Sequence, residues 1–236
     1  IETAAKQCDN VVVSVYVNAL QFGDSTDFDK YPRSIESDYD ASMQAGATVV
    51  FAPTPADIFP PGFDNFVTPS SLAKDFEGVS RPGHFAGVVT VVNRLFDLVK
   101  PDVAIFGTKD FQQLAIIRLL TKHFGFQTRI IACPTVRESN GLAMSSRNMR
   151  LSEKERQDAL IIIETLRLVA SSKSKHSIQE TLVTARSLFE QGSLSLEYLA
   201  IVDPETLNEL TEWQEKQICC IAAHCGSVRL IDNLLF

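Results

Sequence analysis

The stretch Val103-Ala-Ile-Phe-Gly-Thr-Lys-Asp-Phe-Gln-Gln113 decides the fold of this chain, because an apolar strand in it leads directly into a helix. Its first four residues are all apolar, which is typical of a strand buried on both faces. Apolar residues then recur at helical spacing from Phe111 to Phe124, and Gly125 ends the helix. A buried strand followed directly by a helix predicts one unit of a parallel α/β sheet.

The rest of the first half of the chain repeats this alternation of strands and helices. Apolar, β-branched runs predict further strands at residues 10–17, 48–51, 65–68 and 128–132, and helical patterns occupy residues 35–45 and 84–99. Parallel strands joined by helices require right-handed crossovers. Ligands of such sheets bind at the carboxyl ends of the strands, where Asn18–Gln21 and Gly107–Asp110 both lie.

The pattern changes after Pro134, where two long helices precede three strands. The helices are predicted at residues 152–171 and 177–190, and the strands at residues 196–202, 217–223 and 227–231. Ser152 begins the first helix, and Glu155 three residues later completes a capping box. We therefore predict an α/β domain with a parallel sheet at residues 1–135, followed by a small α+β domain at residues 136–236.

Composition excludes several classes of protein. The chain has 236 residues, 45% of them hydrophobic, and no apolar run approaches the roughly 20 residues that a membrane-spanning helix needs. Nothing at its start resembles the apolar core of a secretory signal. A net charge of −7 argues against general nucleic-acid binding, so an anionic ligand would need a local cationic pocket.

The cysteines do not form a recognisable framework. Their number is odd, and their spacing fits neither a set of disulfides nor a four-ligand zinc site; they are Cys8, Cys133, Cys219, Cys220 and Cys225. The adjacent pair should point to opposite faces of a strand. We interpret all five as reduced, mostly buried residues of a cytoplasmic protein, with a His224–Cys225 metal pair as the weaker alternative.

Two stretches about thirty residues apart have the composition of a phosphate-binding site. Lys109 lies where a strand meets a helix N-terminus, a site that is unfavourable for a cation unless an anion binds there. Met144-Ser-Ser-Arg-Asn148 places two hydroxyls and a guanidinium in consecutive positions after Gly141. Either stretch alone reads as an ordinary helix cap or surface turn, but together they favour a nucleoside triphosphate site.

These stretches belong to a series of six motifs that resembles the pantoate–β-alanine ligase family in order and spacing. The similarity spans nearly the whole chain. The motifs are Asn18-Ala-Leu-Gln-Phe22, Tyr31-Pro-Arg33, Arg81-Pro-Gly-His-Phe-Ala-Gly87, Lys109-Asp-Phe-Gln-Gln113, Gly141-Leu-Ala-Met-Ser-Ser-Arg-Asn148 and Arg229-Leu-Ile-Asp-Asn233.

The resemblance implies a fold, a reaction and a setting. The fold would be a Rossmann-like parallel sheet of the nucleotidyltransferase type, followed by a small α+β C-terminal domain that acts as a lid. The reaction would be the ATP-dependent condensation of pantoate with β-alanine through a pantoyl adenylate, with release of AMP and pyrophosphate. Mg²⁺ would accompany ATP. The enzyme would be a cytoplasmic homodimer that binds neither nucleic acid nor membranes.

The resemblance also assigns roles to individual residues. The catalytic residues would be Lys109, Ser145, Ser146 and Arg147. The other contacts with ATP would come from Gly107, Asp110, Val136 and Met144, and those with the acid substrate from Gln21, Gln113, Asn18 and Tyr31. Asp38 would contact Mg²⁺. From the residues alone, Asp110 is equally well a helix cap, both glutamines read as solvated, and Asp38 reads as an ordinary surface carboxylate.

The chain departs from the family pattern mainly at its beginning. Family members carry a first parallel strand and a His-x-Gly-His signature just upstream of the position that matches Ile1. We therefore expect the natural protein to have a preceding segment of a few dozen residues with both features, and residues 1–236 alone to release no pyrophosphate. Smaller departures are Ala19-Leu20 in place of Pro-Met, and Thr108 in place of Glu.

Two rival readings remain open at this point. One is an adenylyltransferase of the same fold class that acts on another small acid. The other is an inactive remnant or binding module, because the His-x-Gly-His signature is not in the sequence.

Overall fold

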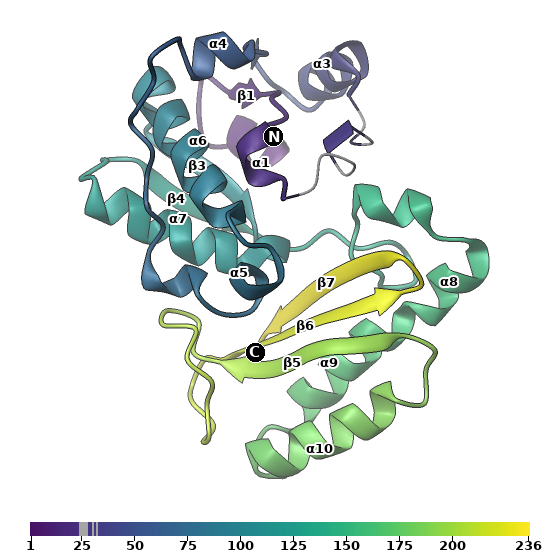
Figure 1. Ribbon diagram of the computed structural model, residues 1–236. Coiled ribbons are helices and arrows are strands. Elements are labelled where there is room, and N and C mark those ends of the chain that lie inside the picture. The colour runs from purple at the N-terminus through teal and green to yellow at the C-terminus, as the bar shows by residue number, and fades with distance from the viewer. Residues whose placement is uncertain (24–27, 30, 32) are drawn as a thin grey trace. The chain divides into compact units, whose positions relative to one another are not determined.

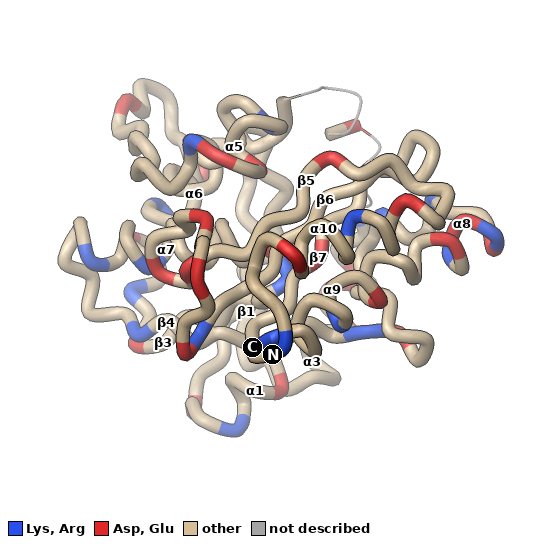
Figure 2. Tube along the Cα trace, turned by 90° about the horizontal axis from the view of Figure 1, so that it is seen from below, with Lys and Arg blue, Asp and Glu red and all other residues tan. Residues whose placement is uncertain are grey.

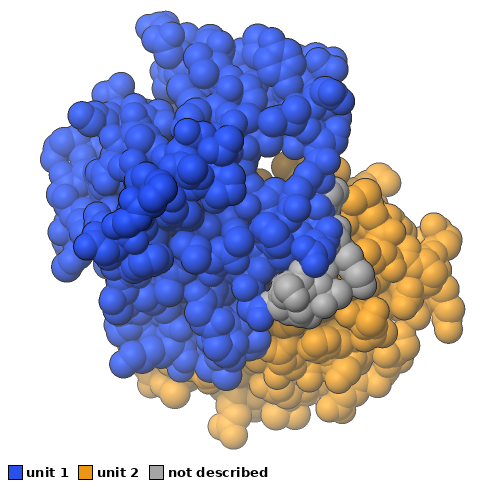
Figure 3. Space-filling view, turned by 45° about the horizontal axis from the view of Figure 1, so that its top comes forward, with its two compact units in different colours: residues 1–106, 116–133 blue, residues 107–115, 134–236 orange. Residues whose placement is uncertain are grey.

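The computed structural model describes residues 1–23, 28–29, 31 and 33–236 (Figure 1). Its contacts divide the chain into two compact units, which are coloured separately in Figure 3. Unit 1 contains residues 1–106 and 116–133, and unit 2 contains residues 107–115 and 134–236. The short segment 107–115 therefore packs with the second half of the sequence, although it follows a strand of the first half.

The strands of unit 1 form two pairs. β1 (Val12–Ser14) is parallel to β2 (Val49–Phe51), with Val13 opposite Val50, and β3 (Val103–Gly107) pairs with β4 (Arg129–Cys133). These strands confirm the predicted α/β class. The predicted strand at residues 65–68 is wrong. The backbone N–H of Val67 donates to the Thr90 hydroxyl (3.0 Å) instead of to a neighbouring strand.

The helices in the described part of unit 1 are α1 (Glu2–Ala5), η1 (Ala19–Gln21), α3 (Ile35–Gln44), α4 (Pro55–Ile58), η2 (Ser71–Ala73), α5 (Glu77–Ser80), α6 (His84–Val99) and most of α7 (Phe111–His123). Helices α4, α6 and α7 contribute buried residues to one apolar cluster. Val88 and Val89 of α6 and Ile116 and Ile117 of α7 are fully buried in this cluster. The apolar faces of α6 and α7 thus form the core of unit 1.

Unit 2 is an antiparallel sheet with two long helices packed against one face. Its sheet has the order β5-β6-β7, from Ser195–Val202, Ile218–Cys225 and Val228–Leu235. Its helices are η3 (Thr108–Asp110), η4 (Ser146–Arg150), α8 (Glu153–Asp158), α9 (Leu160–Ser172) and α10 (Ile178–Phe189). The predicted helix 152–171 is two helices joined at Ala159.

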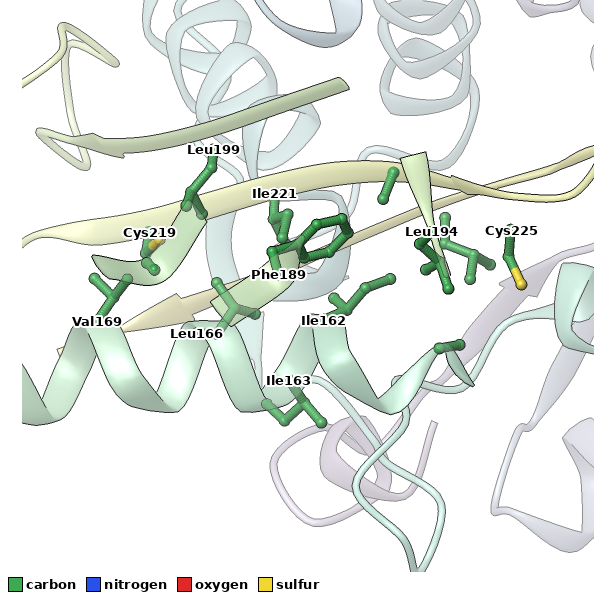
Figure 4. Packing of buried hydrophobic residues seen from close by; sticks show 14 of the residues in the cluster. Ile162, Ile163, Leu166, Val169, Phe189, Leu194, Leu199, Cys219, Ile221 and Cys225 are labelled. Carbon is green, nitrogen blue, oxygen red and sulfur yellow. The ribbon is translucent and has the colours of Figure 1, made fainter. Parts of the chain in front are cut away.

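The core of unit 2 lies between this sheet and α9 and α10 (Figure 4). Leu166 and Val169 of α9 point toward the sheet, where Val169 lies beneath Cys219 of β6, and Phe189 of α10 lies beside Ile221. Cys219 belongs to the same core, and burial holds the pKa of its thiol well above the usual value. All five cysteines are free thiols, and a buried thiol with a raised pKa is chemically inert.

Among the helices that the structure describes, α8 has the highest share of charged residues, with acidic and basic residues alternating along it (Figure 2). The predicted capping box is confirmed, because the Ser152 hydroxyl accepts from the Glu155 backbone and the Glu155 carboxylate accepts from the Ser152 backbone (2.8 Å). Ser177 and Glu180 build the same box at the start of α10. No helix in the described part of the chain is long and apolar enough to span a bilayer.

Candidate functional site

The Lys109 turn is the first part of the candidate site. Gly107 ends β3, and the single turn η3 then leads directly into α7, so Lys109 lies at the start of a helix as predicted. Its side chain is 20% exposed, and its ammonium lies 4.0 Å from the Asp110 carboxylate, which is itself half exposed. An ion pair with this separation and this solvent exposure is weak, so the Lys109 charge remains available to a ligand.

A hairpin leads into the second part of the site. Backbone hydrogen bonds from Glu138 to Leu142 (2.8 Å) and from Met144 to Val136 (2.9 Å) close it, and Gly141 turns it with a φ of 101°. Only glycine adopts that conformation without strain. The chain then enters η4, where the Ser145 hydroxyl accepts from the backbone N–H of Arg147 (3.2 Å). The hairpin thus sets where the Ser145–Arg147 segment begins.

These two parts line one pocket. Its polar wall consists of Lys109, Ser145, Arg147, Asn148, Arg229 and Asp232, and its apolar wall of Leu142, Ala143, Ile162, Ile163, Leu230 and Ile231. Three cations and a hydroxyl therefore converge in a protein whose net charge is −7. Such a local cationic pocket is what an anionic ligand of an acidic protein requires.

The other predicted ATP contacts are not among the residues that line this pocket; they are Gly107, Asp110, Val136, Met144 and Ser146. Ser146 is exposed in the first turn of η4, and the side chains of Val136 and Met144 are 67% and 55% exposed on the hairpin. Arg229 was not predicted as a site residue. It holds Glu197 across the sheet (2.7 Å) and lines the pocket as well. Its only signal in the sequence was its place in the motif Arg229–Asn233.

In unit 1, the predicted substrate residue Asn18 is held tightly by the chain itself. It is 2% exposed, its amide nitrogen donates to the Gly87 carbonyl (3.0 Å), and its oxygen accepts from the Leu20 backbone (3.2 Å). Gly87 allows this contact, because a β-carbon there would collide with the Leu20 backbone. These contacts support a role for Asn18 in shaping the loop after β1.

His84 fixes the same loop from the start of α6. One ring nitrogen, Nδ1, lies 2.9 Å from the Gln21 carbonyl, and the other, Nε2, lies 3.1 Å from the Arg81 guanidinium. A guanidinium only donates and a carbonyl only accepts. The network therefore assigns the ring as a neutral imidazole that carries its proton on Nδ1. Arg81 and His84 thus position the backbone of Gln21.

The two predicted glutamines both keep their side-chain amides available. Gln21 and Gln113 are partly exposed, and their amides form no hydrogen bond with any residue that the structure describes. An amide can fix the orientation of an acid without neutralising its charge. Tyr31 is 43% exposed, with its ring edge against Phe22 at 5.6 Å between centroids; the neighbouring Pro32 of its motif lies outside the described residues.

The described residues do not build a site for a metal ion on their own. They include no group of three or more histidine, cysteine or acidic side chains that could hold one. Asp38 lies exposed in the first turn of α3. A carboxylate at that position also interacts favourably with the helix dipole without any metal.

Known sequences match this chain over nearly its whole length. The sequence model of the family described as Pantoate-beta-alanine ligase matches residues 1–235. The pantothenate synthetase of Shewanella loihica is 42% identical over 100% of this chain and 85% of its own length. That of Desulforapulum autotrophicum is 43% identical over 99% of this chain and 83% of its own length.

Solved structures agree with the sequence comparison. A crystal structure of pantothenate synthetase from Thermus thermophilus superposes with a TM-score of 0.94, at 40% identity over 99% of this chain and 86% of that one. The pantoate-β-alanine ligase from Francisella tularensis, crystallised with beta-gamma ATP and β-alanine, gives a TM-score of 0.78 at 34% identity, over 99% of this chain and 82% of that one.

Proposed function

The chain belongs to the pantoate-β-alanine ligase family, whose members form a C–N bond, and from that premise we propose that it joins pantoate to β-alanine in two steps driven by ATP. The observation that carries this proposal is the pocket of unit 2. In it, Lys109 meets Ser145 and Arg147, which follow about thirty-six residues later in the chain.

In the first step, a carboxylate oxygen of pantoate attacks the α-phosphorus of ATP. The new O–P bond forms as the bond to the β-phosphate breaks, and pyrophosphate leaves. Negative charge moves onto the phosphate oxygens during this exchange, and donors fixed in advance stabilise it. Lys109 supplies a cation toward the α-phosphate, while Ser145, Ser146 and Arg147 bind the leaving phosphates. Gln21 and Gln113 orient the acid.

In the second step, the amine of β-alanine attacks the acyl carbon of pantoyl adenylate. The C–N bond forms, the bond from the acyl carbon to the phosphate oxygen breaks, and the amine loses a proton as AMP leaves. Adenylation is needed because a free carboxylate is a poor acyl donor. Holding both reactants in the correct orientation supplies much of the remaining acceleration.

Three further features complete the proposal. Mg²⁺ enters bound to the triphosphate, since phosphate oxygens and water are its usual ligands and the described residues offer no metal cluster of their own. The enzyme works as a homodimer. It works in the cytoplasm, where its free thiols remain reduced.

Isotope transfer tests the chemistry directly. Pantoate labelled with ¹⁸O in its carboxylate is incubated with ATP, β-alanine and the full-length gene product. We expect one labelled oxygen in AMP and none in pyrophosphate, because the oxygen that attacks phosphorus stays with it. Formation of ADP, or label in inorganic phosphate, would exclude an adenylate. A parallel panel of other short hydroxy acids separates this proposal from an adenylyltransferase of different specificity.

A further inference from the structure

Two neighbouring residues of β7, Asp232 and Asn233, contact the two segments that build the pocket of unit 2: the Lys109 turn and the hairpin that leads into Ser145. They are 4% and 7% exposed. Successive side chains on a strand point to opposite faces, so each residue contacts a different segment. β7 is an outer strand in the order β5-β6-β7, and segments from either face of the sheet can therefore meet along its open edge.

Asn233 holds the Lys109 turn. Its side-chain amide nitrogen donates to the carbonyls of Thr108 (2.9 Å) and Lys109 (2.8 Å). A primary amide has two N–H donors, and here both are used on consecutive peptide groups. The backbone of Lys109 is thereby fixed by a residue 124 positions later in the chain.

Asp232 holds the hairpin that leads into Ser145. Its two carboxylate oxygens accept from the two terminal nitrogens of Arg137 (2.6 and 3.0 Å), a bidentate pair with its carboxylate almost fully buried. The same guanidinium donates to the Gly141 carbonyl (3.2 Å) inside the hairpin. Bidentate pairing fixes direction as well as distance, so Arg137 ties the hairpin to β7.

We propose that Asp232 and Asn233 are positioning residues that together set the separation between Lys109 and the Ser145–Arg147 segment. The proposal rests on the function proposed above for those residues. Neither positioning residue needs to touch a reacting atom. A strand residue and its neighbour form a short rigid link, and a displacement of about 1 Å at a catalytic group can cost about 10²-fold in rate.

The first experiment measures the single-turnover rate of pyrophosphate release by the full-length gene product with ATP and pantoate. We expect Asn233→Ala to lower this rate by about 10²-fold, with a much smaller rise in the KM for ATP. Asn233→Ser, whose hydroxyl donates to one carbonyl only, should fall in between. Leu235→Ala changes an exposed residue (55%) of the same strand and should behave as wild type.

A double-mutant cycle then asks whether Asn233 acts through Lys109. If it does, Asn233→Ala in a Lys109→Ala background should slow the reaction little further. If the two losses multiply in the double variant, Asn233 does not act through Lys109 and the positioning role is overturned. The same conclusion follows if Asn233→Ala reacts at the wild-type rate while Lys109→Ala is slow. Neither result would contradict the proposed function. A wild-type rate for Lys109→Ala would instead overturn the proposed function. Circular dichroism measures the folded fraction of each variant, so that each rate can be expressed per folded molecule. If both Asn233 variants fail to fold, Asn233 has only a structural role.

Asp232 is tested with the same assay. Asp232→Asn keeps the size of the side chain but removes the charge that holds Arg137, and we expect a similar fall in the rate of pyrophosphate release. Arg137→Ala should give the same fall, and the two changes together should be no worse than either alone. Additive losses would show that the two side chains act independently and would contradict the proposed link.

Discussion

Lys109 is the residue on which the proposed adenylation depends most, because its ammonium is the cation of the pocket nearest the start of α7. Lys109→Ala should slow formation of pantoyl adenylate by about 10²–10³-fold, which corresponds to about 3–4 kcal/mol for a lost transition-state donor. Single-turnover kinetics measure this. Lys122→Ala, at an exposed position late in α7, is the matched control. A Lys109→Ala rate within a few-fold of wild type would remove the residue from the mechanism.

Gln21 and Gln113 have amides that no described residue engages. Because we assign them to the acid and not to the phosphates, Gln21→Ala and Gln113→Ala should each weaken pantoate much more than ATP. Calorimetric titration with each ligand separates the two effects, and the exposed Gln127→Ala is a control that should change neither affinity. Equal losses for both ligands would show that the assignment to pantoate is incorrect.

Residue types alone could predict part of this site. Lys109 was predicted because a cation at a helix start is unfavourable unless an anion binds there. Arg147 was predicted because it follows two hydroxyls, and the two stretches together favour a phosphate site although each alone reads as ordinary. The anchoring role of Asn233 was not predictable, because its partners are carbonyl groups more than 120 residues earlier. The same holds for Asn18, whose partner in α6 is 69 residues away. Backbone acceptors leave no trace in the sequence, since every residue has one.

Among the elements, those with local signals were predicted best. A capping box joins residues three positions apart, so Ser152 and Glu155 predict the start of α8 from the local sequence. The split between α8 and α9 at Ala159 has no such signal. The strand at residues 65–68 was wrongly predicted because the local apolar pattern does not show the tertiary contact made there. The backbone N–H of Val67 donates to the Thr90 hydroxyl instead of to a neighbouring strand.

The capping box of α8 also predicts how stability depends on pH. Hydrogen bonds from the Ser152 backbone and hydroxyl lower the pKa of Glu155 below its usual value. A carboxyl with a depressed pKa stabilises the fold above its unfolded-state pKa, and it loses that contribution as pH falls through the folded-state pKa. Glu155→Gln should therefore destabilise the protein at neutral pH, and the difference should vanish in acid.

Urea unfolding at about pH 7 and about pH 3, on either side of the carboxyl range, measures this difference. Glu164→Gln changes an exposed carboxyl in the middle of α9 and is the matched control. A deficit in Glu155→Gln that persists unchanged at the lower pH would contradict the assignment to the capping box.

On the scale of the whole molecule, each unit has a core of its own. Leu166→Ala in unit 2 and Ile117→Ala in unit 1 each empty a fully buried position and should cost about 2–5 kcal/mol. Trp213, the one tryptophan of the sequence, packs against the core of unit 2. Its fluorescence should therefore follow the unfolding of that unit alone.

We expect Leu166→Ala to shift the fluorescence transition, and Ile117→Ala to shift mainly the transition seen by circular dichroism. Val183→Ala, at an exposed position of α10, should move neither by more than a few tenths of a kcal/mol. Equal shifts of both signals in both variants would mean that the two cores unfold as one cooperative system.

The fold class follows from the alternation of strands and helices, which the sequence displays over most of its first half. The boundary between the two units does not follow from this alternation. Residues 107–115 join unit 2 although they continue directly from β3, and Asn233 contacts them from β7. A contact between segments so far apart depends on the completed fold, so composition and periodicity could not indicate it.

The ring of His84, held between the Gln21 carbonyl and Arg81, gives the molecule a spectroscopic reporter. Protonated and unprotonated imidazole nitrogens resonate far apart in ¹⁵N NMR, so this histidine should show two widely separated signals, with Nδ1 as the protonated one. The other three histidines serve as internal references. Titrating pantoate or ATP while watching these two resonances would show which substrate moves the loop after β1. A ring with its proton on Nε2 would contradict the assigned tautomer.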